Sequence, residues 1–332
     1  METKLLSFGA VLISVIALFG GAEGGCRSCG GGDVAWSGET WLEGVLGGPS
    51  RAATDVSAAE AGVAADVANV AEEPIIPEEP IVVEADELST EDLSSWSISA
   101  EELRIRLDRG TKPVVAYVSN IPPHGSYIAG SIKLPSKSLI TGDGSLRSPE
   151  DMAAVLGRAG VTEEDGLVLY GDCFSCGDVT FVFWIMKYLG HRDVAVLLGY
   201  EKEWSSAGIP LSGATSAKAE AVYTPDPRPG LMADYGSVAA GVYQVVDART
   251  PDQYKAGHIP GAVNIDYHRV IEGSWLKSDS DLAEIFADLD EDKPVAVYTK
   301  NGGAASIVWY ALELRGRDAS LYTWNDWLGH RS

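Results

Sequence analysis

The feature that most constrains the fold is a duplicated unit of strand, loop and helix, whose copies lie about 128 residues apart, Tyr170 against Tyr298. Apolar strands that alternate with helices predict a parallel sheet covered on both faces. A period of this length indicates two α/β domains in tandem rather than a solenoid. The first copy runs Gly166-Leu-Val-Leu-Tyr170, loop, Thr180-Phe-Val-Phe-Trp184, and the second Pro294-Val-Ala-Val-Tyr298, loop, Ala305-Ser-Ile-Val-Trp309.

The two copies differ in the loop between strand and helix. The first loop contains Cys173 and Cys176, whereas the second copy has no cysteine. A loop that precedes a helix favours a thiolate, because backbone N–H groups and the positive end of the helix face it. Any thiol chemistry is therefore expected in the first half only.

The remaining pattern extends this organisation over the rest of the chain. Ser99-Ala-Glu-Glu102 is a capping box that predicts the start of a helix. Further strands are expected at 114–118, 194–198, 241–246 and 319–322, and further helices at 148–156 and 279–289. The expected domains are residues 96–213 and 231–332. A linker at 214–230 contains three prolines and should be extended.

The N-terminus is typical of an export signal at residues 1–25. Lys4 precedes an uncharged stretch from Leu5 to Phe19, which is shorter than a membrane-spanning helix. Small residues then lead to Cys26, which resembles the lipidated cysteine of a bacterial lipoprotein. Ordinary cleavage after Ala22 and an uncleaved anchor are the alternatives. Each places the protein outside the cytoplasm, either anchored to a membrane by its N-terminus alone or free in the periplasm or medium.

Charge and composition restrict the partners. The formal net charge is −23, which disfavours nucleic acid, because an acidic surface repels phosphate. Residues 26–95 are rich in Ala, Gly, Pro and Glu, and are interpreted as an acidic tether. Neither expected domain shows metal-ligand spacing beyond one Cys-x-x-Cys, so no zinc site is predicted, and no cofactor is expected. His191, after the first helix, is interpreted as a surface turn residue.

The stretch Val245-Val-Asp-Ala-Arg-Thr-Pro-Asp-Gln-Tyr-Lys-Ala-Gly-His-Ile-Pro-Gly-Ala-Val-Asn-Ile265 is specific. It resembles the signature of the rhodanese (thiosulfate sulfurtransferase) family. The segment that begins at Pro294 is similar to the strand, loop and helix of that family's active site. The resemblance covers roughly residues 97–329 as a tandem pair, more closely in the second half.

This resemblance implies a reaction. In the family, a cysteine directly after the strand takes a sulfane sulfur from a donor such as thiosulfate. It holds the sulfur as a persulfide and passes it to an acceptor such as cyanide or a thiol, and a protein partner is also open. By the same resemblance, the loops supply anion- or substrate-binding positions. These are Gly177, Asp247, Arg249, Lys300, Gly302 and Gly303.

The chain departs from the family pattern at the cysteine itself. Thr299 stands at the cysteine position of the second copy, so that half should be inactive in sulfur transfer. The first copy has Gly171 there, with Cys173 and Cys176 further along, so these two are the candidate catalytic residues. Cys173 is the nearer to the family position, and Cys176 would then release the sulfur by forming a disulfide. Asp172 and Asp178 oppose thiolate formation.

Two further details are eroded in the first copy. Tyr127 replaces His258, and either Ala116 or Tyr117 falls where Asp247 stands in the second copy. Asp247 and Arg249 also fit a structural ion pair. Three functions stay open at this point: sulfur transfer in the first half, thiol–disulfide exchange by Cys173 and Cys176, and a non-catalytic module that binds anions or a protein. A disulfide that only staples the loop is the alternative to a reactive pair.

Overall fold

The computed structural model describes residues 96–109, 112–300 and 302–331. The expected export signal, the lipidation site at Cys26 and the acidic tether lie outside the described residues. Within the ranges that are described, no helix is long and apolar enough to cross a membrane.

The first half is built on a parallel sheet with the strand order β1-β6-β5-β2-β4. Its central strands are buried, as expected when helices cover both faces of a sheet. The strands predicted at 114–118, 167–170 and 194–198 are confirmed. The five strands are β1 (Ser97–Ile98), β2 (Val114–Tyr117), β4 (Ile132–Lys133), β5 (Leu167–Tyr170) and β6 (Val194–Leu197).

The second half has a parallel sheet with the order β13-β12-β8-β9. Met232 adds a parallel bridge to Leu321, at the place that β1 takes beside β6 in the first sheet. The two sheets therefore share one strand order, and the α/β class is confirmed. The four strands are β8 (Gln244–Asp247), β9 (Val263–Asn264), β12 (Val295–Thr299) and β13 (Ala319–Thr323).

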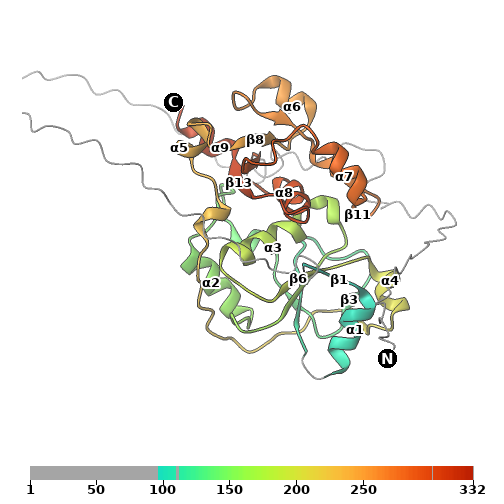
Figure 1. Cartoon of the computed structure of the whole chain (residues 1–332). Helices are drawn as coiled ribbons and strands as arrows, with labels where there is room; N and C mark the ends of the chain where they lie inside the picture. The colour runs from blue at the N-terminus through green and yellow to red at the C-terminus, as the bar shows by residue number, and fades with distance from the viewer. Residues whose placement is uncertain (1–95, 110–111, 301, 332) are drawn as a thin grey trace, which may run out of the picture. The chain divides into compact units, whose positions relative to one another are not determined.

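Helices flank these sheets, and several begin at the predicted caps (Figure 1). The Ser99 hydroxyl accepts a hydrogen bond from the Glu102 N–H at 3.1 Å, and Ser148 caps the next helix in the same way at 3.1 Å. Each satisfies an N–H that has no partner inside its helix. The helices of the first half are α1 (Ala100–Asp108), α2 (Pro149–Arg158), α3 (Asp178–Tyr188) and α4 (Glu201–Ser206), and those of the second α5 (Tyr235–Ala239), α6 (Pro251–Ala256), α7 (Asp279–Ile285), α8 (Ala305–Glu313) and α9 (Trp324–Gly329).

Short elements complete the chain. The sequence pattern did not predict these elements, because two to four residues are too few for a periodicity to show. They are the strands β3 (Tyr127–Ile128) and β7 (Leu211–Ser212), which pair with each other, β10 (Ile271–Glu272) and β11 (Trp275–Leu276), which form a hairpin, and the 3₁₀ turns η3 (Ser136–Leu139), η4 (Phe174–Cys176), η5 (Pro229–Leu231) and η6 (Tyr267–Val270).

One buried tyrosine in each half makes the same contact. The Tyr170 hydroxyl accepts the Ile128 N–H at 3.0 Å, and the Tyr298 hydroxyl accepts the Ile259 N–H at 3.2 Å. In strand register Tyr117 lies beside Tyr170, and Asp247 lies beside Tyr298. The strand register therefore shows that Tyr117, and not Ala116, occupies in the first half the position that Asp247 has in the second.

The two sheets meet through α3 and α8, which lie side by side (Figure 1). The hydroxyls of Thr180 and Ser306, both fully buried, are 2.7 Å apart across this contact. Trp96 stacks on Trp309 with ring centroids 5.6 Å apart. One hydrophobic cluster includes residues of both halves, so the start of each helix, where the candidate loops lie, is held on a shared core.

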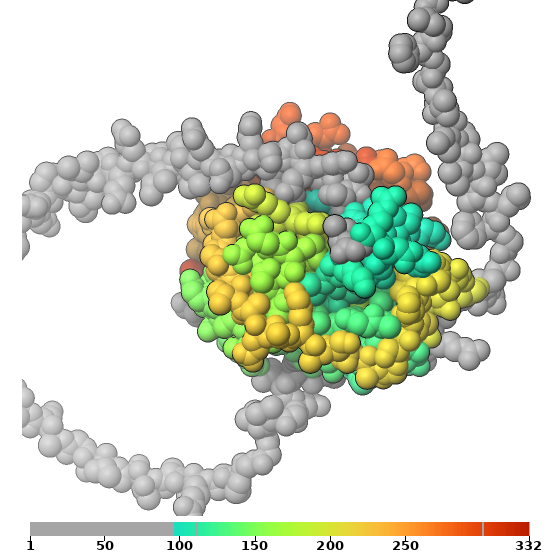
Figure 2. Space-filling model, turned by 90° about the horizontal axis from the view of Figure 1, so that it is seen from below, coloured from blue at the N-terminus to red at the C-terminus, as the bar shows by residue number. Residues whose placement is uncertain are grey.

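The linker between the two sheets, residues 215–228, is extended and runs along the first half (Figure 2). Two glycines give it room: a Cβ on Gly157 would lie 2.5 Å from the Ala221 carbonyl oxygen, and one on Gly190 would lie 2.2 Å from that of Asp226. His191 lies beneath this segment with 1% of its surface exposed, and its Nδ1 is 3.3 Å from the Tyr223 hydroxyl. The interpretation of His191 as a surface residue is wrong, because the linker packs over it.

Candidate functional site

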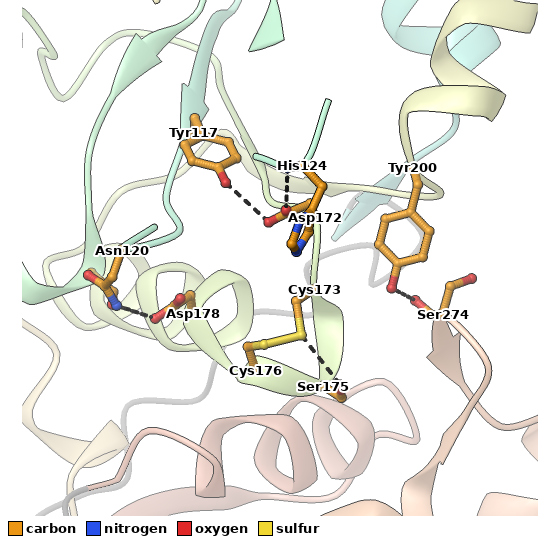
Figure 3. The surroundings of a disulfide bond; sticks show 11 residues. Tyr117, Asn120, His124, Asp172, Cys173, Ser175, Cys176, Asp178, Tyr200 and Ser274 are labelled. Carbon is orange, nitrogen blue, oxygen red and sulfur yellow. Dashed lines mark hydrogen bonds between the residues drawn. A yellow bond between two sulfur atoms is a disulfide. The ribbon is translucent and has the colours of Figure 1, made fainter. Parts of the chain in front are cut away.

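Cys173 and Cys176 form a disulfide on the loop between β5 and α3, with Cα atoms 5.4 Å apart (Figure 3). Three residues separate the end of β5 from the turn η4, which contains Cys176. Gly177 follows with φ +77°, a conformation that favours glycine. This reversal turns the chain into α3 directly after the second cysteine, so the disulfide lies at the start of an 11-residue helix.

The two cysteine residues differ in exposure. Cys173 is 9% exposed, whereas Cys176 is partly exposed. The Ser175 hydroxyl lies 3.5 Å from the Cys173 sulfur. Residue exposure therefore favours Cys176 as the more accessible cysteine, whereas distance from the family position favoured Cys173.

The family cysteine position of the first half is Gly171, because it follows Tyr170 as Thr299 follows Tyr298. A Cβ built on Gly171 would lie 2.7 Å from the Ser119 hydroxyl oxygen and 3.1 Å from a methyl group of Val179. The position therefore has no room for a thiol side chain without a shift of its neighbours. Thiol chemistry in this half can come only from the cysteines further along the loop.

Asp172 ties the disulfide loop to the loop that follows β2. Its carboxylate accepts a hydrogen bond from the Tyr117 hydroxyl at 3.1 Å and from the His124 backbone N–H at 3.2 Å. Figure 3 shows the His124 imidazole beside Asp172, on the side of Cys173. Burial, together with the Asp172 charge, raises the pKa of Tyr117. The sequence pattern did not single out His124, because no residue nearby marks that loop as part of the site.

Asp178 is the first residue of α3 and is 6% exposed. One carboxylate oxygen accepts hydrogen bonds from the Ser136 hydroxyl at 2.6 Å and from the Asn120 amide at 2.8 Å. Burial raises its pKa to about 6, although these hydrogen bonds and the charge of Lys137 act in the opposite direction. The carboxylate therefore holds three segments together at the base of the disulfide loop.

The disulfide loop borders the second half. Phe174 packs on Trp275 of the β10–β11 hairpin with ring centroids 4.3 Å apart. The Tyr200 hydroxyl lies 3.5 Å from the Ser274 carbonyl oxygen of the same hairpin. A Cβ on Gly177 would lie 3.2 Å from the Gly303 carbonyl oxygen. The structure therefore brings Gly177 and Gly303, both predicted binding positions, to one place.

The corresponding loop of the second half runs from β12 to α8. Thr299, its last strand residue, is 6% exposed, and its hydroxyl has no hydrogen-bond partner among the described residues. Gly302 has φ +87° and lies near Phe181 and Thr323. The backbone carbonyl of Lys300 accepts the Asn325 N–H at 3.3 Å. This loop keeps the shape of a turn into a helix, with a hydroxyl where the family has its thiol.

Asp247 and Arg249 form a buried ion pair at the end of β8. The Arg249 Nη2 donates to Asp247 at 2.6 Å and to the Gly257 carbonyl at 2.7 Å. Its guanidinium carbon lies 4.5 Å from the Trp324 ring centre and 5.2 Å from that of Tyr298. Since these partners all belong to the second half, the pair holds the β8 end in place, which is the structural role that the sequence left open.

Comparison with known proteins agrees with this architecture. A family model, the rhodanese-like domain, matches residues 235–329. The chain is 30% identical over 224 residues to a thiosulfate sulfurtransferase-like protein of Mycobacterium tuberculosis, covering 57% of this chain and 77% of that protein. It is 30% identical over 210 residues to the thiosulfate sulfurtransferase of Gallus gallus, covering 57% of this chain and 72% of that enzyme.

Solved structures show the same fold. The rhodanese fold of SseA from Escherichia coli, a 3-mercaptopyruvate sulfotransferase, matches with a TM-score of 0.60 and 22% identity, covering 69% of this chain and 99% of that one. Tum1 from Saccharomyces cerevisiae matches with a TM-score of 0.61 and 18% identity, covering 70% of this chain and 95% of that one. From the matching family model and these relatives, the chain belongs to the rhodanese (thiosulfate sulfurtransferase) family.

Proposed function

We propose that this protein is a sulfurtransferase of tandem rhodanese architecture in which sulfane sulfur passes through a cysteine persulfide on the Cys173–Cys176 loop. The observation that carries the proposal is that this cysteine pair lies on the loop between strand and helix, the loop that begins with the nucleophile in the family. Gly171 has no room for a thiol and Thr299 is not one, so these two cysteines are the remaining candidates in the two loops.

The reaction begins from the reduced pair. One thiolate attacks the outer sulfur of a donor such as thiosulfate, the sulfur–sulfur bond of the donor breaks, and sulfite leaves with the electron pair. The persulfide that forms passes its outer sulfur to a nucleophile such as cyanide or a thiol, which regenerates the thiolate. Alternatively, the second cysteine attacks the inner sulfur, hydrosulfide leaves, and the disulfide forms, so that a dithiol reductant must reopen it.

The loop supplies part of the stabilisation that this chemistry needs. The start of α3 places the positive end of a helix near Cys176, and the Ser175 hydroxyl lies within 3.5 Å of the Cys173 sulfur. The exposure of the two cysteine residues favours Cys176 as the first acceptor and Cys173 as the residue that resolves it. The reverse assignment, with Cys173 as the acceptor, is the other outcome of the test below.

The second half does no sulfur transfer in this proposal. A threonine hydroxyl is a weak nucleophile without an adjacent base, and the Thr299 hydroxyl is buried and has no partner among the described residues. Lys300, Gly302 and Gly303 remain candidates for binding an anion there. We also propose export and an anchor at Cys26, with residues 96–213 and 231–332 as the domains, on the sequence alone.

The deciding experiment is the peptide mass after thiosulfate treatment. Full-length protein is reduced with a phosphine, freed of reductant, exposed to thiosulfate and digested under acid. We expect one added sulfur on the peptide that contains Cys173 and Cys176. Cys173→Ser and Cys176→Ser identify which residue carries it, and Thr299→Val is the matched control that should leave the labelling unchanged. No added sulfur in any sample would refute the proposal.

Thiol–disulfide exchange is the second candidate, favoured by the presence of the Cys173–Cys176 disulfide itself. A reactive disulfide has a reduction potential well above about −300 mV, the range below which structural disulfides fall. Redox titration against glutathione and dithiothreitol buffers measures this potential. A high potential without sulfur labelling favours exchange over sulfur transfer, and a potential below that range favours a structural staple.

A further inference from the structure

Acidic side chains anchor the segments that adjoin the disulfide loop. The Asp172 carboxylate directly precedes Cys173 and is fixed by the Tyr117 hydroxyl and the His124 N–H. Two residues further along the same loop, the Ser126 N–H donates to Glu201 Oε2 at 2.9 Å. The backbone of this loop is thus held by two carboxylates, Asp172 at His124 and Glu201 at Ser126.

The positive end of α3 is partly offset by an acidic residue. Asp178 occupies the first position of the helix, and its carboxylate opposes the positive end of the helix dipole. Its pKa of about 6 leaves it ionised at pH 8. The charge of Lys137 acts on Asp178, and the His124 imidazole lies beside Asp172 (Figure 3). Asp172, Glu201 and Asp178 thus place three carboxylates on the segments that adjoin the disulfide loop.

We propose that Asp172 and Glu201 determine the specificity of this site, so that it reacts with thiols that carry a cationic group in preference to anionic ones. The inference rests on the second candidate under the proposed function, namely that the Cys173–Cys176 disulfide reacts with external thiols. The step concerned is attack by an external thiolate on the sulfur of Cys176, which is the more exposed residue. A mixed disulfide forms, the bond between the two cysteines breaks, and Cys173 leaves as the thiolate. A second external thiol then attacks the mixed disulfide, releases the external disulfide and supplies the second electron of the two-electron reduction.

Electrostatics sets the size of the effect. A unit charge about 8 Å from a carboxylate in water changes the interaction by roughly a factor of two in rate at low ionic strength. Several carboxylates, partly offset by Lys137, give about fivefold for each unit of charge on the reactant. Salt at about 0.5 M screens charges at this distance and should remove most of the difference.

The test compares three small thiols of similar size: cysteamine, 2-mercaptoethanol and 3-mercaptopropionate. Opening of the Cys173–Cys176 disulfide in full-length protein is followed by alkylation and intact mass, at pH 8, where imidazole groups in general carry little charge. Rates are divided by the thiolate concentration of each reagent. We expect cysteamine to react at least fivefold faster than 2-mercaptoethanol, and 3-mercaptopropionate to react slowest, with the order collapsing in high salt.

Variants assign the effect to the named residues. Asp172→Asn and Glu201→Gln should each reduce the ratio of cysteamine to 3-mercaptopropionate about two- to fourfold. Asp252→Asn, at an exposed carboxylate on α6, is the matched control and should leave the ratio unchanged. Glu201→Gln retains a side-chain oxygen for the Ser126 N–H, so it tests charge even if Asp172→Asn perturbs the loop.

The outcomes separate this inference from the proposed function. Equal rates for the three thiols, or ratios that both variants leave unchanged, would overturn the specificity proposal while the reactive disulfide stands. A disulfide that none of the thiols opens would overturn the specificity proposal and the thiol–disulfide exchange candidate, whereas sulfur transfer is judged separately by thiosulfate labelling of the phosphine-reduced protein. If Asp252→Asn also removes the dependence of the rates on thiol charge, the selectivity comes from the net charge of the whole chain. That result would contradict the role of Asp172 and Glu201.

Discussion

Replacing Asp178 by asparagine tests how much the buried carboxylate of Asp178 lowers the free energy of unfolding when it is ionised. Asp178 begins α3 one residue after Gly177, and both of its hydrogen bonds, from Ser136 and Asn120, reach the same oxygen. An amide at this position retains an oxygen that accepts both bonds and carries no charge. The substitution therefore removes the ionised state and leaves the packing close to that of the native protein.

The magnitude follows from the pKa. Burial raises the pKa of Asp178 from 3.8 to about 6, so between pH 4 and pH 6 the native state binds more protons than the unfolded chain. The free energy of unfolding consequently falls as pH rises through this window, by about 1.4 kcal/mol per pH unit, or about 3 kcal/mol in all. Above pH 6 the loss is complete. Asp178→Asn should therefore be neutral at pH 4 and stabilise the protein by up to about 3 kcal/mol at pH 7.

The assay is urea unfolding followed by tryptophan fluorescence, with the disulfide kept intact, at unit steps from pH 4 to pH 7. The difference between variant and wild type is compared at each pH, so that the other carboxylates cancel. Asp252→Asn, at an exposed site, is the control and should show no trend. If the stability difference between Asp178→Asn and wild type is the same at pH 4 and pH 7, or if the variant is less stable than wild type at pH 7, the argument that ionisation of Asp178 destabilises the fold is refuted.

Two further predictions concern the second half and the family cysteine position. Burial raises the pKa of Glu313 to about 8, so the free energy of unfolding should fall between about pH 4.5 and 8. Glu313→Gln should therefore be more stable than wild type by roughly 4 kcal/mol at pH 8. The same urea titration checks this, and a variant whose stability depends on pH as steeply as that of wild type would contradict it. Gly171→Ala should destabilise the protein by about 1–3 kcal/mol, because its Cβ would approach the Ser119 hydroxyl. Adding Ser119→Ala should restore part of the loss, and a Gly171→Ala protein as stable as wild type would mean that a thiol fits there after all.

Much of the fold follows from local patterns that the chain contains twice. Alternation of apolar strands and helices predicted the parallel sheets, and the two copies of the loop identified Cys173 and Cys176 against Thr299. The signature at 245–265 was enough to suggest the family. These features are visible in the sequence because strand period, helix caps and loop residues depend on neighbours only a few positions away.

The contents of the site depend on contacts between distant segments, which no local pattern encodes. Strand pairing decided that Tyr117 matches Asp247, and close approach of Ser119 decided that Gly171 has no space for a side chain. Packing of the linker buried His191. Hydrogen bonds from Tyr117 and His124, which lie far from Asp172 in the sequence, fix the carboxylate that precedes Cys173.

The sequence by itself therefore determined the α/β class, the duplication, the thiol pair and the threonine that replaces the family cysteine. Only the tertiary structure decided which cysteine is more exposed, which acids are buried with raised pKa values, and which residues adjoin the disulfide loop. The physical reason is that desolvation and charge–charge interactions depend on distances in space, and those distances exist only once the two sheets, the linker and the loops between them have packed together.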